Sequence, residues 1–166
     1  MTTTYEDVQV MPTLMRSVDS LTIDHLNKAG RLLVESAEHL AKNPPAYYDG
    51  AKAAQESIIA AYYALLSWHG HELPDGASFT TIARRAESYA SMLRTYHNHA
   101  VALQAITASM DGASSLNITQ REGAFTGFHT ARNALTVVIS LLPERITADA
   151  AQSVRKARSI QSGAAA

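Results

Sequence analysis

Apolar residues recur at steps of three and four along most of this chain, the spacing that places them on one face of an α-helix. The first clear run lies between residues 22 and 42, and its apolar face consists of Leu26, Ala29, Leu33, Ala37 and Leu40. The run ends at Asn43-Pro44-Pro45, where the second proline has no amide proton and restricts the residue before it. We therefore expect an amphipathic helix over 22–42.

The second run is the most regular in the sequence. Its apolar positions alternate steps of four and three through Tyr47, Ala51, Ala54, Ile58, Ala61, Leu65 and Trp68. Gly70 follows as a residue suited to a helix C-terminus. Ile59, Tyr62 and Leu66 lie beside this stripe and widen it. A face this wide predicts burial against two neighbouring helices or against a second subunit.

The third run extends over 79–110 and contains no glycine or proline. Ser78 or Thr80 is its candidate N-cap. The apolar positions are Ile82, Ala86, Tyr89, Leu93, Tyr96, Ala100, Leu103 and Met110. As one straight helix it would measure about 50 Å, against about 36 Å for the second helix. This mismatch predicts a kink or break between Ser88 and Thr95.

Two further helices are predicted in the C-terminal part. Thr119-Gln120-Arg121-Glu122 has the pattern of a capping box and opens a helix that Pro143 ends. On this helix a row of small residues would let a neighbouring backbone approach closely: Gly123, Gly127 and Ala131. A weaker periodic stretch follows, formed by Ile146, Ala150, Val154, Ala157 and Ile160.

No stretch alternates polar and apolar residues as a strand does, so we predict an all-α protein. The expected architecture is an antiparallel bundle of four main helices with a weak C-terminal helix. Along the chain we expect a loosely ordered N-terminal arm at 1–18, the bundle at 19–143, and a short helix with a frayed tail at 144–166.

Composition limits the setting in which this bundle works. Fourteen Lys and Arg stand against fifteen Asp and Glu, so any contact with a polyanion needs a local basic patch. The absence of cysteine excludes disulfides and thiolate metal sites and fits a reducing compartment. The N-terminal residues do not resemble a leader, and no apolar run is long enough to span a bilayer. We predict a cytoplasmic protein without membrane contact.

The seven histidines invite a test for metal and cofactor chemistry. Carboxylate-bridged di-iron bundles use Glu-x-x-His, and no glutamate here has a histidine three residues later. Glu35 and His39 are better explained as a solvated pair, and His69 near a helix C-terminus interacts favourably with the helix dipole. Nucleophile elbows and phosphate-binding glycine loops are absent from the sequence. We therefore predict neither a metal nor a cofactor.

One segment resembles a known family. AYYDGAKAAQESIIAAYYALLSWHGHELPD, residues 46–75, is similar to the second helix of the HEPN superfamily, with tyrosine before an Ala-rich run, Ala-Leu-Leu near its end, and then a glycine and a polar turn containing proline. The resemblance covers residues 20–143. Where many members carry His-Asp-Leu, this chain has Ser78-Phe79-Thr80-Thr81-Ile82. Membership would imply a dimeric helical bundle associated with RNA or nucleotides.

The resemblance also implies candidate catalytic residues. Catalytic HEPN members are metal-independent ribonucleases with an Arg followed four to six residues later by a His, and two copies of this motif face each other across a dimer. Arg94 and His99 match the motif positions, Thr95 matches a polar position after the Arg, and His97 lies between them. In a regular helix Arg94 and His99 would point about 140° apart, so only a break would bring them together. The alternative is that these side chains are simply solvated.

Two groups of basic residues are candidates for one phosphate-binding patch, namely Arg84, Arg85 and Arg94 with Arg155, Lys156 and Arg158. Taken together, the sequence predicts a HEPN-like interaction or substrate-binding module, non-catalytic, in a nucleic-acid-related system such as toxin–antitoxin or defence. Its expected partners are a second copy, RNA or a nucleotide, and a partner protein. The alternatives are an endoribonuclease using Arg94 and His99, and a structural subunit of a helical assembly.

Overall fold

The structure is a computed structural model that describes the backbone of residues 4–109 and 118–165 and the side chains of residues 18–108 and 120–163. All regular structure in these ranges is helical, which confirms the all-α prediction. The elements are α1 (Thr4–Ala41), α2 (Tyr47–Trp68), α3 (Phe79–Tyr89), the 3₁₀ helix η1 (Ser91–Tyr96), α4 (His97–Ser109), α5 (Ile118–Leu141) and α6 (Glu144–Ala165).

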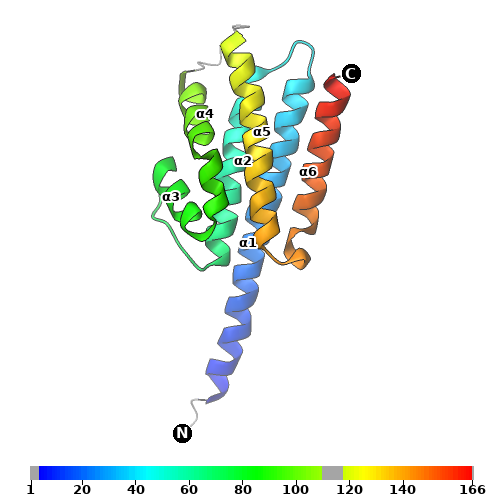
Figure 1. Ribbon diagram of the computed structural model, residues 1–166. Coiled ribbons are helices and arrows are strands. Elements are labelled where there is room, and N and C mark those ends of the chain that lie inside the picture. Colours follow the sequence, from blue (N-terminus) through cyan, green and yellow to red (C-terminus); the bar gives the residue numbers. More distant parts are fainter. Residues whose placement is uncertain (1–3, 110–117, 166) are drawn as a thin grey trace.

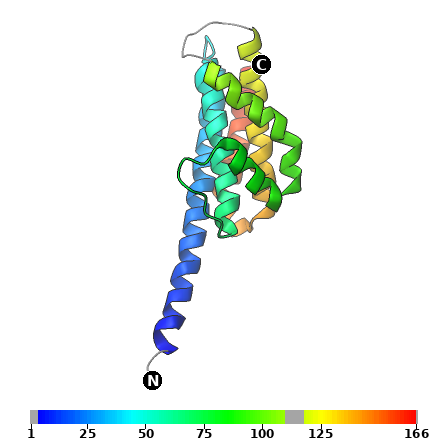
Figure 2. The ribbon, with the colours of Figure 1, turned by 90° about the vertical axis from the view of Figure 1, so that its left-hand side faces the viewer.

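Four long helices form the body of the molecule, and α3, η1 and α4 cover one side of it (Figure 1). The long helices α1 and α6 run one way, while α2 and α5 run the other (Figure 1). Among spatial neighbours, α1 lies against α2 and α6, and α2 lies against α1 and α5. In the view of Figure 2, α4 crosses the long helices obliquely.

The first helix is longer than the sequence pattern indicates. It begins at Thr4, and the predicted segment 22–42 forms its second half. The first half projects beyond the other helices in both ribbon views (Figures 1 and 2). The apolar stripe begins where α2 and α6 begin to pack against α1, and for this reason the pattern located only the packed half.

The broad apolar face of α2 is buried by other helices of the same chain. Its three apolar positions beside the main stripe include Tyr62 and Leu66, both buried, and α2 contacts α1, α3, α4 and α5. Of the two expectations, burial against neighbouring helices is therefore the one observed, and the width of this face is no longer an argument for a second subunit.

The C-terminal helix contributes more than the weak addition that the sequence predicts. It spans 22 residues and packs along α1, where Ala150 and Ala157 are completely buried. Ile146 is buried as well, and Val154 and Ile160 pack partly buried against the core, so small and large apolar residues of α6 share the contact. The alanines let the two helices approach closely.

Small residues set the spacing between α1 and its neighbours. A Cβ added at Gly30 would lie 2.8 Å from Ser153 Cβ of α6, and one at Gly50 would lie 2.8 Å from Leu40 Cδ2 of α1. Two buried serines form hydrogen bonds between α1 and α2. Ser36 of α1 donates to the Gly50 carbonyl of α2, and Ser57 of α2 donates to the Ala29 carbonyl of α1, each at 2.7 Å. The α1–α2 contact is thus tight and fully hydrogen-bonded at these two hydroxyls.

The predicted row of small residues on α5 has the expected role. A Cβ at Gly127 would lie 2.5 Å from Leu103 Cδ1, and one at Gly123 would lie 2.9 Å from Ile106 Cδ1. Both leucine and isoleucine belong to α4, so the row allows α4 to pack closely on α5. The capping-box residue Thr119 is helical, one residue after the start of α5, and its side chain lies outside the described residues.

The ends of α2 and the start of α3 match their sequence signals. Gly70, with φ 66°, follows the last turn of α2, and the amides of Gly70 and His71 donate to the carbonyls of Ser67 and Leu66. This pair of bonds is the Schellman arrangement that glycine favours after a helix. Ser78 is the N-cap of α3, and its hydroxyl accepts from the Thr81 amide at 3.3 Å.

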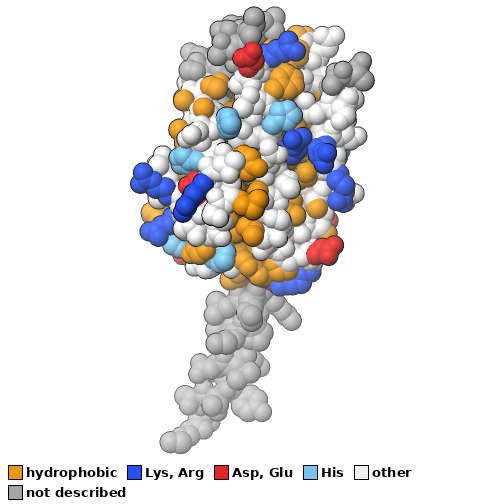
Figure 3. Space-filling view, in the orientation of Figure 1, with side chains coloured by type: hydrophobic (Ala, Val, Ile, Leu, Met, Phe, Trp, Pro, Cys, Tyr) orange, Lys and Arg blue, Asp and Glu red, His pale blue; other side chains and the backbone are white. Residues whose placement is uncertain are grey.

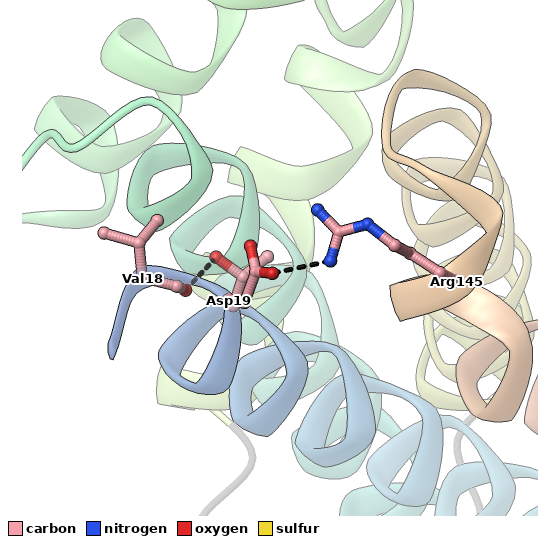
Figure 4. A network of polar contacts seen from close by, with 4 residues as sticks. Val18, Asp19 and Arg145 are labelled. Atoms are coloured by element: carbon pink, nitrogen blue, oxygen red, sulfur yellow. Dashed lines mark hydrogen bonds and ion pairs between the residues drawn. The ribbon is translucent and has the colours of Figure 1, made fainter. Parts of the chain in front are cut away.

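A polar contact joins the start of α6 to α1 (Figure 4). Arg145 Nη1 donates to Asp19 Oδ2 at 2.5 Å, and the same guanidinium lies 5.9 Å from the centre of the Trp68 ring at the end of α2. Because both ionic side chains are partly exposed, the pair contributes less than about 1 kcal/mol and mainly orients the first turn of α6. No helix in the described ranges has both the length and the apolar content needed to cross a membrane.

The tight α1–α6 seam generates a stability prediction. We expect Gly30→Ala to lower the free energy of unfolding by about 1–2 kcal/mol, because overpacking costs more than the roughly 1 kcal/mol that alanine gains in helix propensity. Ser153→Gly removes the colliding atoms, and in that background Gly30→Ala should instead be stabilising. Urea unfolding followed by circular dichroism measures both effects.

Gly163 provides the matched control, since an added Cβ there meets nothing within 4 Å. Gly163→Ala should therefore raise stability by up to about 1 kcal/mol. Equal effects of Gly30→Ala and Gly163→Ala would show that the seam has room for a methyl group.

Candidate functional site at the α3–α4 break

The predicted break in the third run is present and sets the positions of the candidate residues. Helix α3 ends at Tyr89, and Ala90 adopts an extended conformation with φ −146° and ψ 90° before η1 begins. Ala90 and Leu93 are buried, so the chain turns inward at this point to fill the core. Arg94 and Thr95 consequently lie on η1, whereas His97 and His99 lie in the first turn of α4.

His97 is held by a carboxylate on the other side of the break. Its Nδ1 lies 2.5 Å from Oε1 of Glu87, a residue of α3 whose side chain is 11% exposed. A carboxylate has only acceptors to offer, so Nδ1 carries the proton and donates it, and the other ring nitrogen is left for solvent or a ligand. The pair thus orients the ring of His97 and links α3 to α4.

Beneath this pair lies a buried phenol. The Tyr62 ring of α2 stacks on Phe79 with ring centres 6.2 Å apart, and Tyr62 is fully buried. Its hydroxyl has no hydrogen-bond partner among the described residues. Burial, with the nearby Glu87 charge adding to it, raises the pKa of Tyr62 well above its ordinary value. Tyr62 is therefore a neutral, tightly packed side chain close to the Glu87 carboxylate.

The other three candidates do not gather around His97. Arg94 and Thr95 are exposed, and Arg94 has no ion-pair partner among the described residues. His99 is exposed too, and it faces α5 across a cleft of about 220 Å³ whose lining includes Glu122 and Thr126 but not Arg94. After the break, His97 therefore contacts α3, whereas His99 faces α5. Arg94 and His99 do not line one cleft.

The end of α3 is fixed by aromatic stacking. Tyr89 stacks on His69, the residue that follows α2, with ring centres 4.1 Å apart and nearly parallel planes. Its hydroxyl lies 3.3 Å from His71 Nδ1 in the following loop. His69 and His71 thus both contact Tyr89. Among the described residues, no three His, Asp or Glu side chains gather so as to hold a metal ion.

The two groups of basic residues do not form one patch. Arg84 and Arg85 lie on α3 and Arg94 on η1, whereas Arg155, Lys156 and Arg158 lie on α6. Neither α3 nor η1 contacts α6, and the two regions lie at opposite sides of the bundle (Figure 1). Figure 3, in the orientation of Figure 1, shows Lys and Arg side chains at both edges of the molecule, with a column of hydrophobic side chains between them. Each group must therefore be considered separately.

Glu87 is the residue of this site that sequence reasoning missed. It lies ten positions before His97, which is no helical repeat, and only the turn at Ala90 brings the two together. A break predicted between Ser88 and Thr95 was the available signal, since a carboxylate just before such a break can reach residues just after it. Comparison of the chain with protein-family models, with curated proteins and with solved structures found no match.

The Glu87–His97 contact predicts a measurable effect on stability and on the imidazole. We expect Glu87→Gln to lower the free energy of unfolding by about 1–3 kcal/mol, because a nearly buried, charge-assisted hydrogen bond is replaced by a weaker one. It should also reduce the population of the Nδ1–H tautomer of His97 in ¹⁵N NMR spectra. The exposed carboxylate of Glu38 on α1 gives the control, and Glu38→Gln should change neither quantity. An unchanged His97 tautomer in Glu87→Gln would contradict the assignment.

Proposed function

We propose that this chain is a HEPN-like helical-bundle module that binds RNA through its phosphates and does not cleave it, in a nucleic-acid-related system of the toxin–antitoxin or defence type. The observation that carries the proposal is the group Arg84, Arg85 and Arg94, called here the α3–η1 arginines. All three are exposed, and none has a carboxylate partner among the described residues. Guanidinium groups bind phosphate oxygens in bidentate fashion, and unpaired ones have no internal ion pair to break first.

The fold supports this proposal through α2 and its surroundings. The segment 46–75 that resembles the HEPN second helix contains α2 and the turn that follows it. Around it, we propose, α1, α2, the α3–α4 segment and α5 form the antiparallel HEPN-like arrangement, with α6 added along α1. The feature that supports it is that α1 and α4 run opposite to α2 and α5.

A non-catalytic role is supported by the separation of the candidate residues. Cleavage without a metal needs an imidazole that moves a proton and a cation that stabilises the phosphate, both at one scissile bond. Within one copy, Arg94 and His99 do not line a common cleft. Binding needs no such convergence, because each phosphate contact contributes separately.

Homodimerisation remains part of the proposal, now on different grounds. Tyr89, Met92 and Val101 are three of the five large apolar side chains that the described residues leave exposed, and all three lie on α3, η1 or α4. Met92 is 62% exposed. A second copy covering this region would remove apolar surface from water and would place two sets of α3–η1 arginines near each other.

Charge removal tests the RNA-binding proposal. We expect the triple variant Arg84→Gln/Arg85→Gln/Arg94→Gln to weaken binding of a fluorescein-labelled 20-nucleotide single-stranded RNA at least 10-fold, measured by anisotropy at 100 mM salt. The slope of log Kd against log salt should fall by about 2, since each phosphate contact to a single strand contributes about 0.7. The control variant Arg155→Gln/Lys156→Gln/Arg158→Gln removes the same charge from α6. Equal losses in both variants would show that only net charge matters.

A second candidate function, a metal-independent endoribonuclease, is favoured by one observation. Glu87 fixes the proton of His97 on Nδ1 and leaves the outer nitrogen free, which is how a carboxylate prepares an imidazole as a general base. Such a base would take the proton of a ribose 2′-hydroxyl, whose oxygen would then attack phosphorus. The 5′-oxygen would leave with a proton supplied by the protonated His99 of a second copy, and a 2′,3′-cyclic phosphate would remain. Arg94 and His99 of a second copy would complete this site across a dimer.

Cleavage in EDTA separates the two candidates. The binding module predicts that RNA is recovered intact, whereas the ribonuclease predicts 2′,3′-cyclic ends that disappear in Arg94→Ala, His97→Ala and His99→Ala. Light scattering at the same concentration reports whether the dimer that catalysis requires is present. Intact RNA that also fails to bind would favour the structural subunit of a helical assembly.

A further inference from the structure

A separate cavity lies between α1, α2 and the loop that joins α2 to α3. Its volume is about 710 Å³, within the range of small-molecule sites. In both ribbon views (Figures 1 and 2) the loop returns alongside α2 before α3 begins, so it forms the outer wall of the cavity. Neither Glu87 nor His97 lines this cavity, which is therefore distinct from the site at the α3–α4 break.

Carboxylates outnumber cations in the lining of this cavity. Glu56 comes from α2, and Glu72 and Asp75 come from the loop, whereas Lys28 of α1 carries the opposite charge. All four residues are exposed, and no ion pair joins them to one another or to other described residues. A ligand therefore has no internal ion pair to displace, and the excess of negative charge favours a cation.

Two stacked rings also line the cavity. His25 of α1 and Tyr63 of α2 lie with their ring centres 5.6 Å apart, and both residues are partly buried. Burial, with the nearby Lys28 charge adding to it, lowers the pKa of His25, so its ring is uncharged at neutral pH and does not repel a cation. A tyrosine ring attracts ammonium groups placed over its face. Ile59 and Leu73 add apolar surface, against which methylene groups can pack.

The loop that forms the outer wall is anchored at both ends. Near its start, His71 Nδ1 lies 3.3 Å from the Tyr89 hydroxyl of α3. Towards its end, the Ala77 amide donates to the Pro74 carbonyl at 3.1 Å and closes a turn in which Gly76 has φ 76°. Glycine adopts this backbone conformation without the steric cost that other residues incur. The wall that carries two of the three carboxylates is thus ordered before a ligand binds, which lowers the cost of binding.

We propose that this cavity binds a linear aliphatic polyamine, a ligand whose ammonium groups are joined by methylene chains. Its ammonium groups bind Glu56, Glu72 and Asp75. Its methylene chain lies against Tyr63 and Leu73. Carboxylates on two different walls suit a ligand with separated charges, and nowhere in the described ranges do three His, Asp or Glu side chains gather closely enough to hold a metal ion. The proposal does not rest on RNA binding, because none of these residues belongs to the α3–η1 arginines.

Isothermal titration calorimetry with spermidine tests the proposal on the full chain. We expect spermidine to bind about 10-fold more tightly than butylamine, which has one ammonium group, and than Mg²⁺, which has no methylene chain. Glu72→Gln/Asp75→Asn should weaken spermidine binding about 10-fold, whereas the matched variant Glu38→Gln/Asp149→Asn should leave it unchanged. Both variants change exposed residues, so circular dichroism should show an intact fold.

The aromatic ring has a test of its own. Tyr63→Leu should weaken spermidine binding about threefold, because it removes the ring that attracts an ammonium group. Tyr63→Phe keeps the ring and should bind spermidine as the unchanged chain does. Equal weakening in the two variants would overturn the role of the ring.

Equal binding of Mg²⁺ and spermidine would show attraction by charge alone, and equal binding by the two double variants would place spermidine outside the cavity. Either result overturns the proposal. So does the absence of heat with spermidine, confirmed by the absence of saturation transfer to its methylene protons. Trilysine carries the same net charge on a bulkier backbone, and its binding as tightly as spermidine would identify a basic peptide as the occupant instead. The titrations contain no RNA, so failure of RNA binding leaves these outcomes unaffected.

Discussion

The close approach of helices through glycine, alanine and serine is the constraint on which this structure depends. At Gly30 and Gly50 even one additional carbon would collide with a neighbouring helix, and the same holds for Gly127 against α4. Because the helices lie so near one another, serine hydroxyls reach carbonyls across the α1–α2 seam and become fully buried. These close contacts supplement a core of large buried side chains such as Leu33, Leu65 and Phe128, and together they fix the positions of the side chains that the helices carry.

The break at Ala90 depends on that rigid body. Ala90 and Leu93 turn into the core, and the energy of burying them offsets the helical hydrogen bonds lost at the break. The same turn places Glu87 beside His97 and leaves Arg94 on the outside. Core packing, rather than any local preference for a kink, therefore decides which polar side chains face one another.

Much of the fold follows from the sequence because its helices carry regular stripes with clear ends. The bounds of α2, its glycine cap, the Ser78 cap and the break near Ala90 were all predictable from local rules. Two features were not. The start of α1 precedes its stripe, because backbone that does not pack against the bundle leaves no apolar repeat. The apolar stripe of α6 predicted the helix itself, but spacing alone does not show that it packs along α1.

The site was less predictable than the fold for a related reason. The spacing of residues in the sequence predicts where side chains point only within one regular helix. Across the extended residue Ala90 it no longer does so. Glu87 therefore escaped notice, while Arg94 and His99, matched by spacing, lie apart. The α1–α6 seam has the opposite character, since a larger residue at Gly30 meets the Cβ and Oγ of Ser153 whatever the function. Divergent relatives should thus keep a small residue at Gly30 while their outward arginines drift.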